Sequence, residues 1–288
     1  MTSLMFLDAP SLIYRAFFSV PKTITDPSGQ PVNAVRGFLD MIATLQAERQ
    51  PDKIVAVMDA DWRPQFRVDA YPGYKADRPE EPEELTPQFE MLPELLDAAG
   101  IRRAEAAGFE ADDVIATLCH NVTDDDRAVV VTGDRDMLCL VRDPQVRILF
   151  TIKGVRVLES FDEAAVQEKY GVPPRLYSEF AMLRGDSSDG LPGVAGIGPV
   201  RAAKLLAERG SIEGILSDLS TLPPKQAEAF ENARDYLAAV KKVVPPVTDV
   251  EVECSATDGP QAEKFMDMAR ERNLESPATR LLQAVWNS

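Results

Sequence analysis

The sequence predicts an α/β protein in which a mostly parallel central sheet, flanked by helices, is joined to an α-helical half. In the first half, short apolar runs alternate with segments of helical spacing, which is the pattern of layered βαβ units. From about residue 161 the pattern changes to short helices separated by Pro and Gly. A chain of 288 residues with 45% hydrophobic content allows one large domain or two smaller ones. We therefore expect an α/β domain over 1–165 and an α-helical region over 166–288.

The individual elements follow from local spacing. Strands are expected at short apolar runs, which cover residues 4–8, 53–59, 101–106 and 127–133, with a β-hairpin over 146–160 that turns near Lys153 and Gly154. Helices of the first half are expected over 11–20, 32–50, 86–100, 111–122 and 134–141. Helices of the second half are expected over 161–171, 174–185, 198–210, 211–219, 225–244 and 262–273.

Acidic residues follow three of the expected strands and recur just before a glycine-rich loop. The set comprises Asp8, Asp59, Glu110, Asp112, Asp113, Asp134, Asp136, Asp186 and Asp189. Because the carboxyl ends of parallel strands meet where α/β sheets bind ligands, we expect these acids to converge. So many carboxylates repel one another unless cations hold them, and divalent hard cations prefer oxygen ligands. The pattern predicts a site with two or more divalent ions for phosphate chemistry.

Composition narrows the chemistry further. His120 is the only histidine, which excludes Ser-His-Asp hydrolysis and histidine-rich zinc sites. A net charge of −16 argues against a non-specific nucleic-acid binder, but weakly, because many of the acids belong to the predicted metal site. The three cysteines show no CxxC spacing, and no apolar run reaches membrane-spanning length. We expect a cytoplasmic protein with reduced thiols, without a secretion signal and with no membrane association.

The stretch between Asp59 and Thr86 has four prolines and no clean period. A loop of this length in a compact domain is typical of a functional lid or of disorder. Its basic and aromatic residues are interleaved: Trp62, Arg63, Phe66, Arg67, Tyr71, Tyr74, Lys75 and Arg78. That mixture suits single-stranded nucleic acid, with cations on phosphates and rings on bases. The alternative is an irregular surface loop with incidental charge.

The segment LPGVAGIGPVRAAKLL combines a glycine-rich turn with a helix start. Gly196 and Gly198 allow a tight hairpin with uncovered N–H groups, and Pro199 is expected at the first helical position. Such a helix N-terminus binds phosphate, and Arg201 and Lys204 follow on the same helix. A nucleotide-binding turn competes with this interpretation, but no strand precedes the glycines. We therefore predict a helix–hairpin–helix over about 183–210 that grips a duplex backbone.

These motifs together resemble the flap endonuclease and 5′→3′ exonuclease family, which supplies the nuclease domain of bacterial DNA polymerase I. The resemblance rests on LDAPSLIYRAFF, VMDADWRPQFRVDAYPGYKADRP, GFEADDVIATL, VVTGDRDMLCLV and MLRGDSSDGLPGVAGIGPVRAAKLL. It covers nearly the whole chain and implies a PIN-like 5′-nuclease core with a helical arch, at about 61–90. No polymerase domain follows, so we expect the stand-alone form, acting as a monomer.

The resemblance also implies roles for particular residues. The nine acids would be the metal ligands, with Asp113 and Asp186 acting partly through water. Between VMD and FR there is one residue more than the family pattern, so Asp59 and Asp61 compete as ligand, and the strand-end position favours Asp59. Lys75 and Arg78 would neutralise the scissile phosphate. The positions expected to contact DNA are Arg15, Arg67, Tyr74, Lys75, Arg78, Gly196, Gly198, Arg201 and Lys204.

The implied activity is hydrolysis of DNA phosphodiesters at 5′ flaps, nicks or ends during replication and repair, leaving a 5′-phosphate and a 3′-hydroxyl. Mg²⁺ or Mn²⁺ would be the cofactor, and a K⁺ ion is also considered at the helix–hairpin–helix. Two alternatives stay open at this point. One is a PIN-like ribonuclease with a similar carboxylate site, and the other is a structure-specific DNA-binding module without catalysis.

Overall fold

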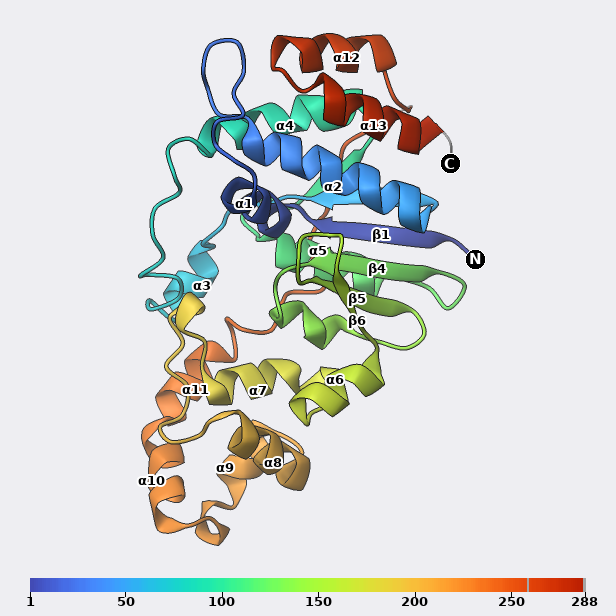
Figure 1. Cartoon of the computed structure of the whole chain (residues 1–288). Coiled ribbons are helices and arrows are strands. Elements are labelled where there is room, and N and C mark those ends of the chain that lie inside the picture. The colour runs from blue at the N-terminus through green and yellow to red at the C-terminus, as the bar shows by residue number, and fades with distance from the viewer. Residues whose placement is uncertain (258, 287–288) are drawn as a thin grey trace.

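A mixed seven-stranded sheet lies at the centre of the computed structural model, which describes residues 1–257 and 259–286 (Figure 1). The strand order is β6-β5-β4-β1-β2-β3-β7. The strands are β1 Ser3–Asp8, β2 Lys53–Val57, β3 Arg102–Glu105, β4 Arg127–Thr132, β5 Val146–Thr151, β6 Leu158–Phe161 and β7 Glu253–Cys254. The five central strands pair in parallel, and β6 and β7 are antiparallel edges.

The register of the central strands brings their carboxyl ends together. Asp8 at the end of β1 pairs with Val57 at the end of β2, and Leu7 pairs with Val131 of β4. These strands are buried on both faces, as their near-continuous apolar runs predict. The loops that leave the three strands therefore begin along one edge of the sheet.

Helices cover both faces of the sheet (Figure 1). One apolar core contains residues of α1 Ala9–Ser19, α2 Asn33–Arg49 and α4 Thr86–Ala98. The opposite core contains residues of α5 Ala111–His120, the 3₁₀ helix η1 Asp136–Leu140, α6 Glu163–Tyr170 and α7 Tyr177–Arg184. It continues into α8 Pro199–Arg209, α9 Ile212–Ser217, α10 Pro224–Asn232 and α11 Arg234–Val240. Short 3₁₀ turns complete this half: η2 Pro174–Leu176, η3 Ser187–Asp189 and η4 Leu219–Thr221. The short α3 Gln65–Ala70 lies in the stretch that had no clean sequence period.

The predicted hairpin over 146–160 is confirmed, since β5 and β6 pair antiparallel from Ile148 with Phe161 to Thr151 with Leu158. The helix expected over 134–141 is a 3₁₀ helix, and the helix expected over 225–244 is divided at Ala233 into α10 and α11.

The end of the chain departs from the expected division at 165/166. After α11 the chain returns to the sheet, where β7 pairs with β3. The helices α12 Ala262–Glu271 and α13 Glu275–Trp286 then pack against α4 and α2 (Figure 1). Phe265 and Leu281 are completely buried in the first core. The region 166–288 is thus not one helical body, because its last part covers the α/β half. Within the described ranges, no helix is both long and apolar enough to cross a bilayer.

Candidate active site

Asp8 stands at the centre of the acidic edge, where β1 ends and α1 begins. Its side chain is 3% exposed and accepts hydrogen bonds from the Ser11 amide and the Thr132 hydroxyl. Burial raises the pKa of Asp8 to about 7 against the lowering effect of Thr132, and repulsion from Asp134 and Asp59 adds to the rise. A carboxylate in this position gains from a bound cation.

Asp59, rather than Asp61, is directed toward the start of α5. Asp59 Oδ1 accepts a hydrogen bond of 2.7 Å from the amide of Ala111, in the first turn of α5. Asp61 Oδ1 instead accepts from the amide of Arg63, two residues along its own loop. Asp59 thus lies beside the turn of α5 that carries Glu110 and Asp112, and its role as a ligand stays a prediction.

The three acids at the start of α5 face different surroundings. Glu110 is the N-cap, and its carboxylate receives the Tyr74 hydroxyl at 2.7 Å, Arg67 Nη1 at 2.7 Å and the Lys75 ammonium. Asp112 faces the acidic edge, where burial and then repulsion from Asp134 and Asp8 raise its pKa well above the ordinary value. Asp113 is completely buried, and its carboxylate pairs with Arg67 at 2.7 Å.

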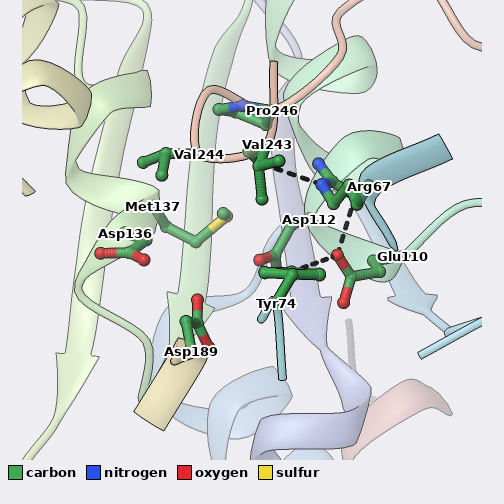
Figure 2. A pocket seen from close by; sticks show the side chains of 10 residues that line it. All are labelled: Arg67, Tyr74, Glu110, Asp112, Asp136, Met137, Asp189, Val243, Val244 and Pro246. Carbon is green, nitrogen blue, oxygen red and sulfur yellow. Dashed lines mark hydrogen bonds and ion pairs between the residues drawn. The ribbon is translucent and has the colours of Figure 1, made fainter. Parts of the chain in front are cut away.

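Asp134 and Asp136 follow β4 and lie on the other side of the same edge. Asp134 Oδ1 accepts the amide of Asp136 at 2.8 Å, which fixes the turn into η1. Burial raises the pKa of both carboxyls. The hydrogen bond from the Asp136 amide opposes this rise at Asp134, and repulsion from Asp189 adds to it. At Asp136, repulsion from Asp134, Asp189 and Asp186 adds to the effect of burial on the pKa. Figure 2 shows Asp112, Asp136 and Asp189 around one small pocket, together with Glu110 and Tyr74.

Asp186 and Asp189 come from the loop after α7. Asp186 caps η3, since its Oδ1 accepts the amide of Ser188 at 2.9 Å. Asp189 Oδ1 lies 2.7 Å from Arg78 Nη2, and Asp189 lines the pocket, whereas Asp186 also accepts the Ser188 hydroxyl and lies 3.5 Å from Arg184 Nη2. The three-residue spacing therefore brings one carboxylate to the pocket and leaves the other at its rim.

A docking segment, residues 71–78, closes over this loop. The amide of Lys75 donates to Asp189 O at 3.1 Å, the Tyr71 hydroxyl to Gly190 O at 3.1 Å and Arg78 Nε to Ser188 O at 3.2 Å. Lys75 adopts a positive φ of 50°, which turns its side chain inward to Glu110. Tyr74 and Lys75 are 5% and 7% exposed, so they belong to the interior of the site. With its ring buried, Tyr74 offers little surface to DNA in this structure, and its DNA contact stays a prediction.

Gly190 makes this docking sterically possible. Its φ is +71°, and a Cβ placed there would lie 2.2 Å from Gly73 O in the docking segment. We predict that Gly190→Ala lowers the free energy of unfolding by about 1–3 kcal/mol and reduces turnover, because the segment must move away. Gly29→Ala is the control, since Gly29 also has a positive φ but nothing lies within 4 Å of its Cβ position. Equal denaturant midpoints for the two variants would contradict the steric argument.

The residues expected to contact the duplex lie on the surface at two separate places. Gly196 has a φ of +75° and Gly198 is the N-cap of α8, and open space surrounds the Cβ position of each. Arg201 Nη1 donates to Gly196 O at 2.7 Å, and Lys204 is exposed one turn further on. Arg15 is half-buried and holds the end of β5 through Thr151 O at 3.1 Å.

Two of the predicted roles do not fit the geometry. Arg67 was expected on DNA, but it is 2% exposed and bonded to Glu110 and Asp113. Asp113 was expected among the metal ligands, but both of its oxygens are taken by Arg67. Sequence reasoning also missed Thr132, whose hydroxyl contacts Asp8. The available signal was a hydroxyl residue at the end of the strand, the Thr of TGDRD.

The donor set fits a hard divalent cation. The acids of this edge are carboxylates that repel one another, and no His or Cys is among them. In the described part of the chain, no three acidic, His or Cys side chains already enclose a metal position. Magnesium commonly uses one or two carboxylates per ion and completes its shell with water and substrate phosphate, so an open arrangement suits it.

Comparison with known proteins identifies the family of the chain. Residues 3–171 match the family model of the 5′-3′ exonuclease N-terminal resolvase-like domain, and residues 172–266 match that of the 5′-3′ exonuclease C-terminal SAM fold. A 5′-3′ exonuclease of Mycobacterium tuberculosis is 42% identical over 98% of this chain and 97% of its own length. One from Streptomyces coelicolor is 47% identical over 85% of this chain and 86% of its own length. DNA polymerase I of Mycobacterium bovis is 43% identical over 83% of this chain, which corresponds to 26% of that protein.

Solved structures show the same fold at low sequence identity. The T5 D15 protein co-crystallised with metal ions is 16% identical, with a TM-score of 0.64 over 99% of this chain and 98% of its own. The catalytic core of Rad2 in complex with a DNA substrate is 18% identical, with a TM-score of 0.64 over 99% of this chain and 93% of its own. The two family models and the full-length relatives establish that the chain belongs to the 5′-3′ exonuclease family.

Proposed function

We propose that the chain hydrolyses DNA phosphodiesters at 5′ ends, nicks and 5′ flaps, using two or more Mg²⁺ or Mn²⁺ ions. The observation that carries the proposal is the acidic edge itself. Carboxylates from β1, the loop after β2, α5, the loop after β4 and the loop after α7 face one another there. Lys75 and Arg78 lie directly among these carboxylates.

We divide the acids into two groups, following the roles that the family resemblance implies. The first group would hold one ion and comprises Asp8, Asp59, Glu110 and Asp112. The second would hold a neighbouring ion and comprises Asp134, Asp136 and Asp189, with Asp186 acting through water. Bound ions would supply an activated water and stabilise charge on the leaving oxygen. Asp113 is left out of both groups because Arg67 occupies it.

The remaining roles belong to cations of the chain. Lys75 and Arg78, released from Glu110 and Asp189 by competing cations, would neutralise the scissile phosphate. The exposed backbone around Gly196 and Gly198, with Arg201 and Lys204, would hold the duplex backbone. A K⁺ ion would bind at the same hairpin, and the protein would act as a monomer. The acidic edge and the hairpin would thus bind different parts of one DNA molecule.

The test is cleavage of a 5′-flapped duplex with each divalent ion in turn, with products resolved to one nucleotide. We expect cleavage near the flap junction with Mg²⁺ or Mn²⁺ and none with a chelator. Preferred cleavage of single-stranded RNA would favour the PIN-like ribonuclease. Flap binding without cleavage under any metal would favour a non-catalytic module.

Divalent ions should also stabilise the folded protein. Binding at a concentration one hundred times Kd contributes about 2.7 kcal/mol, so millimolar Mg²⁺ or Mn²⁺ should raise the melting temperature by several degrees. Melting in NaCl of matched ionic strength is the control. An unchanged melting temperature at saturating metal would count against the site.

The stabilisation of the fold by divalent ions should depend on pH. Burial raises the pKa of Asp8 from 3.8 to about 7, so the folded state holds this proton more tightly than the unfolded state. The stability contributed by this group is complete below about pH 4 and is lost as the pH rises through about 7. In chelator, the melting temperature should therefore decrease between pH 5 and pH 8, and divalent ions should reduce that decrease.

A further inference from the structure

Arg67 is a surface-type residue placed in the interior. It lies on α3 and is only 2% exposed, although its neighbours Gln65, Phe66 and Asp69 are exposed. Its guanidinium makes a bidentate pair with Asp113, with Nη1–Oδ2 and Nη2–Oδ1 both at 2.7 Å. Burial alone would lower the pKa of Arg67, but Asp113 and then Glu110 raise it above its ordinary value. A buried guanidinium held in this way is fixed in position and permanently charged.

The same guanidinium reaches Glu110. Arg67 Nη1 donates to Glu110 Oε2 at 2.7 Å, and the Tyr74 hydroxyl donates to the same oxygen at 2.7 Å (Figure 2). Two donors on Oε2 leave Oε1 as the oxygen directed to Lys75. Arg67 and Tyr74 therefore decide which way the Glu110 carboxylate points.

Arg67 also holds the strap, residues 243–250, which leads from α11 back to β7. Arg67 Nε donates to Val243 O at 2.9 Å, and Asp113 Oδ1 accepts the amide of Val247 at 2.8 Å. The Thr117 hydroxyl accepts the amide of Val250 at 3.2 Å, so the strap runs along α5. Its first residues, Val243, Val244 and Pro246, line the same pocket as Glu110 and Asp112 (Figure 2). The Arg67 side chain therefore connects α3 to both the strap and Glu110.

From these contacts we infer that Arg67 is a positioning residue for the cleavage reaction. Anchored to the strap and to Asp113 of α5, it orients the Glu110 carboxylate toward a divalent ion. The inference rests on the proposed function for the identity of that ion. Removing a side chain that hydrogen-bonds to a metal ligand and orients it usually lowers metal affinity or activity by roughly 10- to 100-fold. Arg67 has no surface left for a phosphate, so its loss should not act through DNA binding.

A DNA contact and a positioning role make opposite predictions for Arg67→Met. The positioning role predicts that Mn²⁺ binding, measured by calorimetry without DNA, weakens roughly tenfold. It also predicts that kcat falls while the KM for flapped DNA is nearly unchanged. Loss of a phosphate contact would instead leave the Mn²⁺ affinity unchanged. It would reduce the slope of log K for DNA binding against log salt concentration by about one.

Amide exchange at Val247 gives a readout that needs neither metal nor substrate. In Arg67→Met, Asp113 loses its partner, and exchange of the Val247 amide should become at least about tenfold faster. The matched control is Arg103→Met, because Arg103 makes a similar bidentate pair with Asp97, at 3.0 and 2.9 Å, between β3 and α4. It should lose stability without a change in Mn²⁺ affinity or in Val247 exchange.

Arg67→Lys keeps the buried charge and is the second variant for these measurements if Arg67→Met does not fold. A lysine cannot reach Val243, Glu110 and Asp113 together, so its Mn²⁺ affinity should lie between those of the wild type and Arg67→Met. Wild-type Mn²⁺ affinity in a folded Lys or Met variant would overturn the inference. Failure of the wild-type chain to cut flapped DNA would instead overturn the proposed function, while the exchange at Val247 would still test the role of Arg67.

Discussion

Asp134→Asn should abolish metal-dependent cleavage while leaving the fold intact. Removing groups that only orient metal ligands costs roughly 10- to 100-fold, so removing a direct ligand should reduce kcat by more than about 100-fold. Stability should be preserved, because the asparagine oxygen can still accept the amide of Asp136. Burial disfavours the charge at this position, so the metal-free variant should melt at the same temperature as the wild type or higher.

The measurement is single-turnover cleavage of a 5′-flapped duplex at several Mn²⁺ concentrations, alongside thermal melting in chelator. Asp125→Asn is the matched control, since Asp125 is an exposed acid in the turn before β4. It should cleave like the wild type. Near-normal turnover in Asp134→Asn would remove the second group of acids from the proposal.

Lys75→Met should reduce kcat by roughly 100-fold or more, the range found when one charge-stabilising donor is removed from an active site. Methionine retains much of the buried stem and removes only the ammonium that pairs with Glu110. Mn²⁺ should bind at least as tightly as in the wild type, because a competing cation has been removed from Glu110. The metal-free variant should melt at a lower temperature, since a buried carboxylate has lost a partner.

Arg78→Met is the comparison for Lys75→Met. Arg78 is more exposed and pairs with Asp189 at 2.7 Å, so its loss should affect stability less. Rates, Mn²⁺ affinities and melting temperatures of both variants separate a charge effect from a folding effect. If Lys75→Met keeps full turnover, the ammonium has only a structural role at Glu110.

Much of the acidic edge could be predicted from the sequence because strand ends are easy to recognise. Asp8 and Asp134 follow apolar runs directly, and parallel pairing then places such residues along one edge. The start of α8 was equally readable, since Gly196, Gly198 and Pro199 have strong local preferences. In each case the deciding interactions are local.

The roles of Asp113 and Arg67 depend on distant partners and could not be predicted in this way. Successive helical residues point about 100° apart, so Asp112 and Asp113 cannot share a direction. Which of them faces the edge is decided by the strap, 130 residues further along the chain, through Val247 and Thr117. The burial of Lys75 likewise depends on the docking of its segment against Gly190. Local patterns contain none of these contacts.

The return of the chain to the sheet has a mechanical consequence. The α6–α11 region leaves the core after β6 and re-enters it through the strap and β7, and the terminal helices then close over α2 and α4. These helices share one apolar core with α5 and the sheet, so the region is held by packing as well as by its two chain connections. The second connection lies beside the first turn of α5, where Asp113 accepts the amide of Val247. A displacement of this region would therefore act on the turn that carries Glu110 and Asp112.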